Sequence, residues 1–305
     1  MSDTIHIYWP GDYRPTPNQL ALPLIEESTQ QLERALDRLG RRHVRVPGLL
    51  TRPDESIERL GPIDEPLIGV YAHWVYGPHT TDGVVGKDSP LLLASNFSGT
   101  WPGLVGLLNT AACLEMVDRK ASRVWTDAAD WSRDDAFMQR LEAWCTKGKI
   151  EYSTDALHAP PPTPAAAQAI ADGVYEQFRR RRALVLMLGD TSMGMINGYF
   201  GPRLLSRVGF AEHKVDQAWI IERGKSIPDD RIDAALEFVR SKGVTFHYGI
   251  EGAEDYDANA TREQLRDYLA VLDLVNEFHA DCIGWQYQLG LIRSRPPSDF
   301  AEGLF

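Results

Sequence analysis

The chain has 305 residues, enough for two domains of ordinary size, and its hydrophobic fraction of 43% and charged fraction of 25% are typical of a globular protein. The net charge of -11 disfavours nucleic acid as a partner, because its phosphates would be repelled. The three cysteines form no CxxC pair, the N-terminus lacks the pattern of a signal peptide, and no apolar run is long enough for a membrane span. We therefore expect a cytoplasmic protein that makes no membrane contact.

The first half of the chain alternates short apolar runs with amphipathic stretches. The runs predict strands at Ile5–Trp9, His43–Val46, Pro66–Tyr71, Pro90–Ala94 and Arg123–Thr126. The amphipathic spacing predicts helices at Leu22–Leu39, Leu104–Val117 and Asp134–Thr146, the second with Thr100 as its N-cap. A stiff proline-rich segment, Ala159–Pro164, interrupts the pattern before a helix at Ala165–Arg181.

The pattern restarts at the apolar run Ala183–Leu188, which is typical of a parallel strand buried on both faces. Further strands are expected at Val244–Tyr248 and Asp281–Trp285, and helices at Asp229–Lys242 and Thr261–His279. Thr261 and Gln264 have the spacing of a capping box. Strand–helix alternation through the whole chain predicts an α/β protein with two doubly wound, Rossmann-like parallel-sheet domains.

Two loops follow strong strands, at Asn96–Gly103 and Gly189–Met195, where open α/β sheets bind ligands. The first is equally consistent with a structural turn and with a ligand site, whereas the second matches no phosphate-binding fingerprint and is more consistent with a tight strand-to-helix turn that glycine permits. Trp74 ends another strand, where tryptophan serves as rim packing or as a flat platform for a sugar. The residues alone indicate a small polar ligand and leave the chemistry open.

Weaker patterns have structural explanations. Asp255–Asn259 begins like a calcium loop but lacks its later glycine and glutamate, so helix entry explains its polarity. His279 and Asp281 form an HxD pair at a helix-to-strand junction, where that spacing is usually accidental. The basic run Arg179–Arg182 suits the end of a helix, because cations stabilise the helix dipole there.

Six stretches, taken in order, resemble the L-fucose isomerase family. They are Trp74–Gly77, Asn96–Gly103, Gly189–Met195, Val215–Asp216, Ile283–Gln288 and Ser298–Leu304. Near the N-terminus, Asp12–Arg14 corresponds to an arginine-bearing loop of that family. The resemblance implies two N-terminal α/β domains, here residues 1–181 and 182–305, followed in the family by a barrel-like domain.

The resemblance also implies an activity. Members of this family interconvert aldoses and ketoses through an enediol, with a divalent metal, usually Mn²⁺, that polarises the sugar oxygens. The family's metal ligands lie beyond the segment that Ser298–Leu304 resembles, and Phe305 ends this chain. We therefore expect that this chain lacks the barrel-like domain, binds no metal itself and has no catalytic activity alone.

The resemblance also implies that three residues of this chain contact the substrate. Gln286 matches a glutamine that hydrogen-bonds the sugar, and Trp74 matches a tryptophan that packs near the sugar in a neighbouring subunit's site. Arg14 matches an arginine of the same domain. The expected partners are an aldose or ketose and further copies of the chain, hexamers being typical of the family.

Asp190–Thr191 and Trp101 differ from the commoner family pattern, so the sugar need not be fucose. The alternative function is a sugar-binding or regulatory module that holds an aldose without metal and without turnover. A nucleotide-dependent enzyme remains a third interpretation, although the glycine fingerprint it needs is not present.

Overall fold

The computed structural model describes residues 4–97, 101–190, 193–251, 256–286, 291 and 294–305. The chain divides into two compact units. Unit 1 comprises residues 1–159 together with the short segment 194–198, and unit 2 comprises residues 160–193 and 199–305. Both units are α/β, and every strand pair in both sheets is parallel, as the strand–helix alternation predicted.

Unit 1 is built on a five-stranded sheet in the order β2-β1-β3-β4-β5. Its strands are β1 (Thr4–Pro10), β2 (Arg42–Leu50), β3 (Leu67–Tyr71), β4 (Leu91–Asn96) and β5 (Ser122–Thr126). The two central strands β3 and β4 are buried along almost their whole length, which is why they read as continuous apolar runs in the sequence. The sheet order is that of the flavodoxin-like doubly wound fold.

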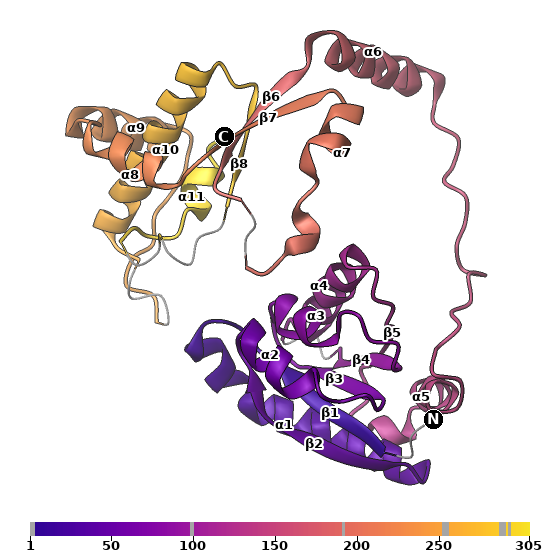
Figure 1. Ribbon diagram of the computed structural model, residues 1–305. Coiled ribbons are helices and arrows are strands. Elements are labelled where there is room, and N and C mark those ends of the chain that lie inside the picture. Colours follow the sequence, from indigo (N-terminus) through magenta and orange to yellow (C-terminus); the bar gives the residue numbers. More distant parts are fainter. Residues whose placement is uncertain (1–3, 98–100, 191–192, 252–255, 287–290, 292–293) are drawn as a thin grey trace. The chain divides into compact units, whose positions relative to one another are not determined.

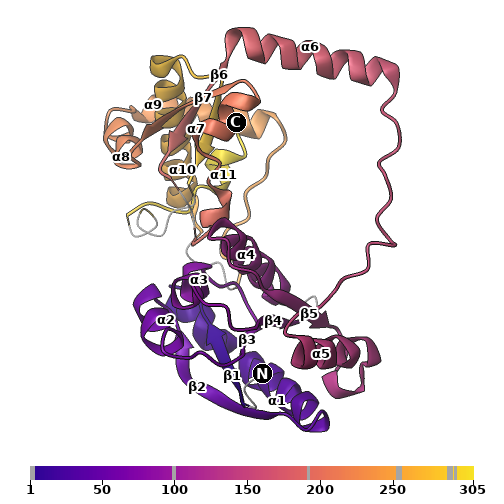
Figure 2. The ribbon, with the colours of Figure 1, turned by 45° about the vertical axis from the view of Figure 1, so that its right-hand side comes forward.

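Helices cover both faces of this sheet (Figures 1 and 2). The helical elements are α1 (Pro15–Arg38), α2 (Pro53–Leu60), α3 (Pro78–Val84), α4 (Gly103–Met116), the 3-10 turn η1 (Trp131–Arg133) and α5 (Asp135–Lys147). Helices α1 and α5 pack on one face, whereas α2, α3 and α4 contribute to the apolar cluster on the other. The alternation of strand side chains supplies both clusters, since successive residues of β3 and β4 point to opposite faces.

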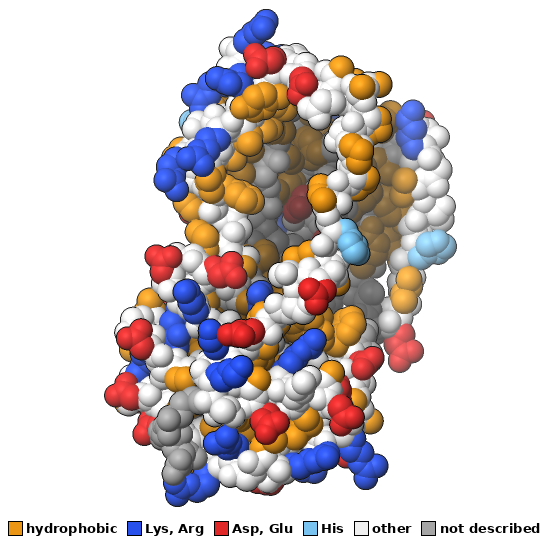
Figure 3. Space-filling model, turned by 90° about the vertical axis from the view of Figure 1, so that its right-hand side faces the viewer, with side chains coloured by type: hydrophobic (Ala, Val, Ile, Leu, Met, Phe, Trp, Pro, Cys, Tyr) orange, Lys and Arg blue, Asp and Glu red, His pale blue; other side chains and the backbone are white. Residues whose placement is uncertain are grey.

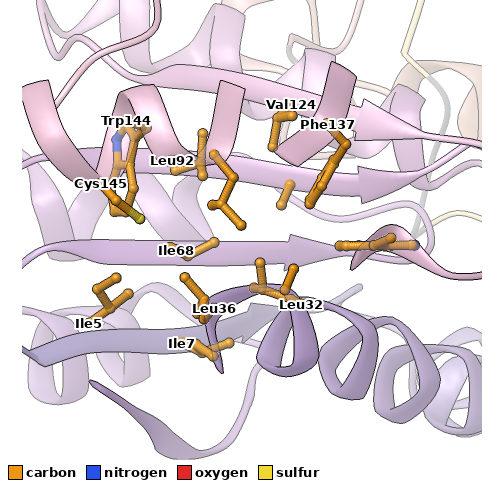
Figure 4. Packing of buried hydrophobic residues seen from close by; sticks show 14 of the residues in the cluster. Ile5, Ile7, Leu32, Leu36, Ile68, Leu92, Val124, Phe137, Trp144 and Cys145 are labelled. Atoms are coloured by element: carbon orange, nitrogen blue, oxygen red, sulfur yellow. The ribbon is translucent and has the colours of Figure 1, made fainter. Parts of the chain in front are cut away.

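The larger of the two clusters lies between the sheet and helices α1 and α5 (Figure 4). Leu32 and Leu36 of α1 pack toward Ile68 of β3, and Trp144 of α5 approaches from the other end of the cluster. Each of these side chains is completely buried. Complete burial of a large apolar side chain contributes about 2 kcal/mol, so this cluster fixes α1, and with it the loop that precedes α1.

Unit 2 contains a smaller sheet in the order β7-β6-β8. Its strands are β6 (Ala183–Leu188), β7 (Phe210–Val215) and β8 (Cys282–Trp285). Its helices are α6 (Ala165–Arg181), α7 (Gly201–Arg207), α8 (Ala218–Lys225), α9 (Asp229–Ser241), α10 (Ala258–Phe278) and α11 (Asp299–Glu302). Helices α8, α9 and α10 pack with Leu186 and Leu188 of β6 in one apolar cluster.

Two local predictions for unit 2 are wrong. Residues 244–248 form no strand, since Gly243 and Gly249 bracket them with positive φ angles of 89° and 73° and their side chains stay largely exposed. The second strand of the sheet is instead β7, whose charged residues at an exposed edge hid it from a search for apolar runs. Thr261 does not cap α10, because Asp257 is the N-cap and its carboxylate accepts from the Ala260 amide.

Helix α6 buries none of its side chains. The division into units places the helix with unit 2, whereas the family resemblance places the boundary at residues 181 and 182, where the helix ends. The two boundaries thus differ mainly in where they assign an exposed helix and the proline-rich segment before it.

Acidic and basic side chains are interspersed on the face of the molecule that Figure 3 shows. Within the described residues, no helix is both long enough and apolar enough to cross a bilayer.

Candidate functional site

The sheet order of unit 1 reverses between β1 and β3. Chain connections leave β1 toward β2 and β3 toward β4, so the carboxyl ends of β1 and β3 flank the topological switch point. Open α/β sheets bind their ligands at this point, because the loops diverge there and leave a crevice. The loops concerned are residues 11–14 after β1 and residues 72–77 after β3.

The loop after β1 holds a buried carboxylate against an arginine. Asp12 is completely buried, and its carboxylate accepts hydrogen bonds from the backbone amide of Arg14 at 2.8 Å and from Arg14 Nη2 at 2.6 Å. Arg14 Nε donates to the same carboxylate at 3.1 Å. This forked pairing fixes the guanidinium in orientation and balances its charge.

Asn18, in the first turn of α1, ties this loop to the next one. The Asp12 amide donates to Asn18 Oδ1 at 2.8 Å, and Asn18 Nδ2 donates to the Asp12 carbonyl at 2.7 Å. These two bonds settle which end of the side-chain amide is oxygen. His73 Nε2, from the loop after β3, lies 2.9 Å from Asn18 Oδ1. Because that oxygen only accepts, His73 must carry its proton on Nε2.

The tautomer leaves the lone pair of His73 Nδ1 buried and without a hydrogen-bond donor among the described residues. His73 is 1% exposed, and Nδ1 has no hydrogen-bond partner within the described part of the chain. Burial lowers the pKa of His73 to about 4, against the opposing field of Asp12. The ring is therefore neutral at physiological pH, and Nδ1 is a pure acceptor.

His79, in α3, has the opposite arrangement. Its Nδ1 lies 2.7 Å from the carbonyl oxygen of Gly11, so Nδ1 carries the proton and donates it. Its ring stacks on Tyr76, with centroids 5.2 Å apart and planes inclined by 16°. Burial also lowers the pKa of His79. The Gly11 carbonyl accepts a second bond from the Tyr76 amide, so the two switch-point loops are joined directly.

Trp74 follows His73 in the same loop. Its indole Nε1 is buried and has no acceptor within the described residues. The loop after β3 thus supplies an acceptor on His73 and a donor on Trp74, in adjacent residues and both uncharged. Trp131 and Trp144 in the hydrophobic core also have a buried Nε1 without a partner among the described residues, so this feature alone does not mark a ligand site.

Unit 2 has a switch point of its own, at the carboxyl ends of β6 and β8. The amide of Asp190, which follows β6, donates to Gln286 Oε1 at 2.9 Å. Gln217 Nε2 donates to the Gln286 carbonyl at 2.9 Å, and Lys214 Nζ pairs with Asp190 at 2.7 Å. Gly189 has a positive φ of 96°, and any side chain there would collide with Gln286. The glutamine is consequently held by backbone as well as by side chains.

The three residues expected to contact substrate therefore occupy switch points. Arg14 and Trp74 lie in the two loops of the unit 1 switch point, and Gln286 lies at that of unit 2. Sequence reasoning missed Asn18 and His73. His73 stands beside Trp74 and could have been found by that adjacency, whereas nothing in the sequence marks Asn18, whose role depends on the turn between Asp12 and α1.

Parts of the predicted motifs lie outside the described residues. Residues 98–100, which include the expected N-cap Thr100, belong to the loop Asn96–Gly103, and residues 191–192 belong to the loop Gly189–Met195. Residues 287–288 end the stretch Ile283–Gln288, and Asp255 begins the calcium-like pattern. Of the HxD pair, His279 ends α10 in a left-handed conformation, and the Asp281 carboxylate accepts from the Leu184 amide and from Arg181. Both therefore have structural roles.

No family model matches the chain, and no curated protein matches it significantly. The resemblance to the L-fucose isomerase family therefore remains a hypothesis carried by the motifs.

Lowered histidine pKa values make the stability of unit 1 depend on pH. In the unfolded chain His73 takes up a proton near pH 6.5, whereas in the folded protein it stays neutral down to about pH 4. Stability is thus greatest above pH 7 and falls as the pH drops from 6.5 toward 4, by about 2 kcal/mol at pH 5 for His73 alone. Urea unfolding followed by tryptophan fluorescence at pH 7.5 and pH 5 measures this loss.

The His73→Gln variant serves as the control, because glutamine does not titrate in this range. Its loss of stability between the two pH values should be smaller than that of the wild type. An equal loss in both proteins would show that His73 does not have the depressed pKa.

Proposed function

We propose that this chain is the sugar-contacting part of an aldose–ketose isomerase resembling L-fucose isomerase. The observation that carries the proposal is the position of the residues that the resemblance names. Arg14 and Trp74 lie in the two loops of one switch point, and Gln286 lies at the other.

The chemistry of the unit 1 switch point also supports a sugar. Asp12 and Arg14 balance each other, and burial keeps His73 and His79 neutral, so this group carries no net charge. An uncharged set of donors and acceptors beside an aromatic ring suits hydroxyl groups and the apolar face of a sugar. The resemblance further implies that Trp74 serves the site of a neighbouring subunit, so an oligomer is part of the proposal.

Manganese is implied by the resemblance, and the described residues do not fit it. They contain no group of three or more His, Cys, Asp or Glu side chains arranged to hold a metal ion. Asp12 is already engaged by Arg14, and Asp267, the other buried carboxylate among the described residues, by Arg295. We derive no step of the isomerisation through a metal, and we propose for these residues the binding and orientation of the sugar.

The alternative is a sugar-binding module without catalysis. Each unit holds polar groups at its own switch point, and this arrangement serves binding as well as it serves turnover. Turnover decides between the two functions. Ketose formation from an aldose, once the protein is supplied with Mn²⁺ and any partner chain, supports the isomerase, and binding without conversion under the same conditions supports the module.

Substitution of the three contact residues tests the sugar site. Titration of L-fucose, L-arabinose and the corresponding alditols by calorimetry should give about tenfold weaker binding for Arg14→Ala, Trp74→Phe and Gln286→Ala. Arg180→Ala and Gln168→Ala remove an arginine and a glutamine from the exposed helix α6 and should leave binding unchanged. Binding that is absent in the wild type, or equally weakened by the controls, would contradict the proposal.

A further inference from the structure

We propose that a cleft at the amino ends of β4 and β5 binds a small molecule that carries a phosphate or carboxylate group, with Arg119 as the residue that contacts this group. This is a second site of unit 1. The switch point lies at the carboxyl ends of the parallel strands, so the cleft lies at the opposite edge of the sheet. The proposal therefore does not depend on the sugar site.

The cleft has a volume of about 770 Å³, which is within the range usual for small-molecule sites. It is formed by the segment that precedes β4, the segment between α4 and β5, and the segment that follows α5. Tyr152 also lines it, and the backbone of Arg123 holds the Tyr152 hydroxyl group, with the amide donating at 2.5 Å and the carbonyl accepting at 2.9 Å. The lining includes five cationic side chains, which are Arg119, Lys120, Arg123, Lys147 and Lys149.

Arg119 carries a buried charge that no carboxylate of the described residues compensates. Within that part of the chain, three charged side chains are buried, namely Asp12, Asp267 and Arg119. Asp12 pairs with Arg14, and Asp267 pairs with Arg295, whereas Arg119 forms no ion pair among the described residues. Burial lowers the pKa of Arg119, as expected for a cation that has lost water. Because an uncompensated buried charge is unfavourable, an anion from outside the chain would stabilise it.

Backbone carbonyl groups fix the orientation of the Arg119 guanidinium. Nε donates to the carbonyl of Val84 at 3.2 Å, Nη1 donates to that of Lys120 at 2.8 Å, and Nη2 donates to that of Ser89. Carbonyl groups carry no net charge, so these bonds hold the guanidinium without neutralising it. A guanidinium has five N–H donors, and two of those on Arg119 therefore have no acceptor among the described residues. An anionic oxygen can accept from them and supply the missing negative charge.

The other charges around the cleft are exposed. Of the five cations, only Lys149 forms an ion pair within the described residues, with Glu151 at 3.1 Å. Lys147 lies in the last turn of α5, where a cation also stabilises the helix dipole. Water screens exposed charges much more than it screens Arg119, so the buried arginine, rather than the number of cations, indicates an anion. Three exposed carboxylates also line the cleft, and these are Asp88, Glu115 and Asp118.

The size of the cleft narrows the class of ligand. A cleft of this volume holds more than a lone phosphate or carboxylate group. We therefore expect an organic molecule whose anionic group contacts Arg119 and whose remainder contacts Tyr152. A phosphate ester and a polycarboxylate share this chemistry, and titration with both kinds of compound distinguishes them.

Calorimetric titration with pyrophosphate, glycerol phosphate and citrate tests the site, at an ionic strength held constant with NaCl. We expect at least one of these anions to bind at one site per chain and to raise the thermal midpoint of the protein. Binding of the phosphate compounds alone assigns a phosphate ester, and binding of citrate alone assigns a polycarboxylate. If none of the three binds to the folded wild-type protein, the inference is overturned.

Variants of the lining separate a specific site from attraction by net charge. Lys120→Ala and Lys147→Ala remove exposed cations, so they should fold as the wild type does and bind the anion about threefold to fivefold more weakly. Arg119→Lys keeps the charge but loses the planar fork of donors, and it should bind about tenfold more weakly.

Arg133→Ala is the matched control, because it removes an arginine that is 83% exposed and follows the carboxyl end of β5, at the other edge of the sheet. It should bind the anion as the wild type does. A control that weakens binding as much as Lys147→Ala does would show attraction by net charge alone and would contradict the site. Sugar binding should be the same in all four variants, so failure of the anion site leaves the proposed function unaffected.

Discussion

Replacing Asn18 with alanine should destabilise unit 1 by about 3 kcal/mol, because it removes the hydrogen-bond partner of three buried groups at once. The Asp12 amide, the Asp12 carbonyl and His73 Nε2 would each lose the partner that the Asn18 amide supplies. Asn18 itself is 8% exposed, so water has little access to replace it. The midpoint of urea unfolding, followed by the fluorescence of the buried Trp131 and Trp144, measures the loss.

Gln30 provides the control on the same helix. Its amide is exposed and donates to Glu26 across 2.8 Å, an interaction that water can replace. Gln30→Ala should therefore change stability by no more than about 0.5 kcal/mol. Asn18→Asp is informative as well, since it keeps acceptors for the Asp12 amide and for His73 but introduces a charge that cannot donate to the Asp12 carbonyl. Equal effects of Asn18→Ala and Gln30→Ala would contradict the structural role given to Asn18.

Replacing Arg295 with alanine should destabilise unit 2 by about 3 kcal/mol, because it leaves the carboxylate of Asp267 buried without its partner. Asp267 lies in α10 and is 2% exposed, and Arg295 donates to it from Nε at 3.0 Å and from Nη2. Arg295 also pairs with Glu263 of the same helix. Hydrogen exchange of the α10 amides reports the loss in unit 2 without interference from unit 1.

The stability that Arg295→Ala loses should increase with pH. Burial raises the pKa of Asp267 to about 6, above the value near 3.9 of an unfolded aspartate, even with Arg295 present. Loss of Arg295 raises this pKa further, since the arginine lowers it. The penalty should thus be largest at pH 7.5 and smaller at pH 5, where folded Asp267 takes up a proton.

Two further variants complete this test. Arg262→Ala removes an exposed ion pair with Asp233 and should cost less than about 1 kcal/mol. The double variant Arg295→Met with Asp267→Leu removes both charges and should recover most of the stability, because apolar replacement of a buried ion pair is often neutral. A double variant no more stable than Arg295→Ala would show that the pair contributes through something other than its charges.

The sequence predicted the class of fold and most of the central elements of unit 1. Strands β3 and β4 are buried on both faces, and burial of that kind produces apolar runs that need no tertiary information to detect. Strand β7 could not be found in this way. It lies at a sheet edge, and its charged residues Glu212 and Lys214 sit in register with Val185 and Met187 of β6.

The candidate site was predictable in part. The motifs supplied Arg14, Trp74 and Gln286, whereas the polar network around Asn18 depends on contacts that the sequence does not encode locally. His73 and Asn18 are 55 positions apart, and only the pairing of β1 with β3 brings their loops together. The same limit applies to Gln264, which was expected to cap a helix and instead accepts from the amides of Phe300 and Ala301.

The exposed helix α6 has a consequence for biosynthesis. Both apolar clusters of the unit 1 sheet draw only on residues before 160, so this unit can complete its core while the rest of the chain is still being translated. The 17 residues of α6 then form a rod of about 26 Å that contributes to neither core. The core of unit 1 is therefore complete before β6, the central strand of the unit 2 sheet, leaves the ribosome.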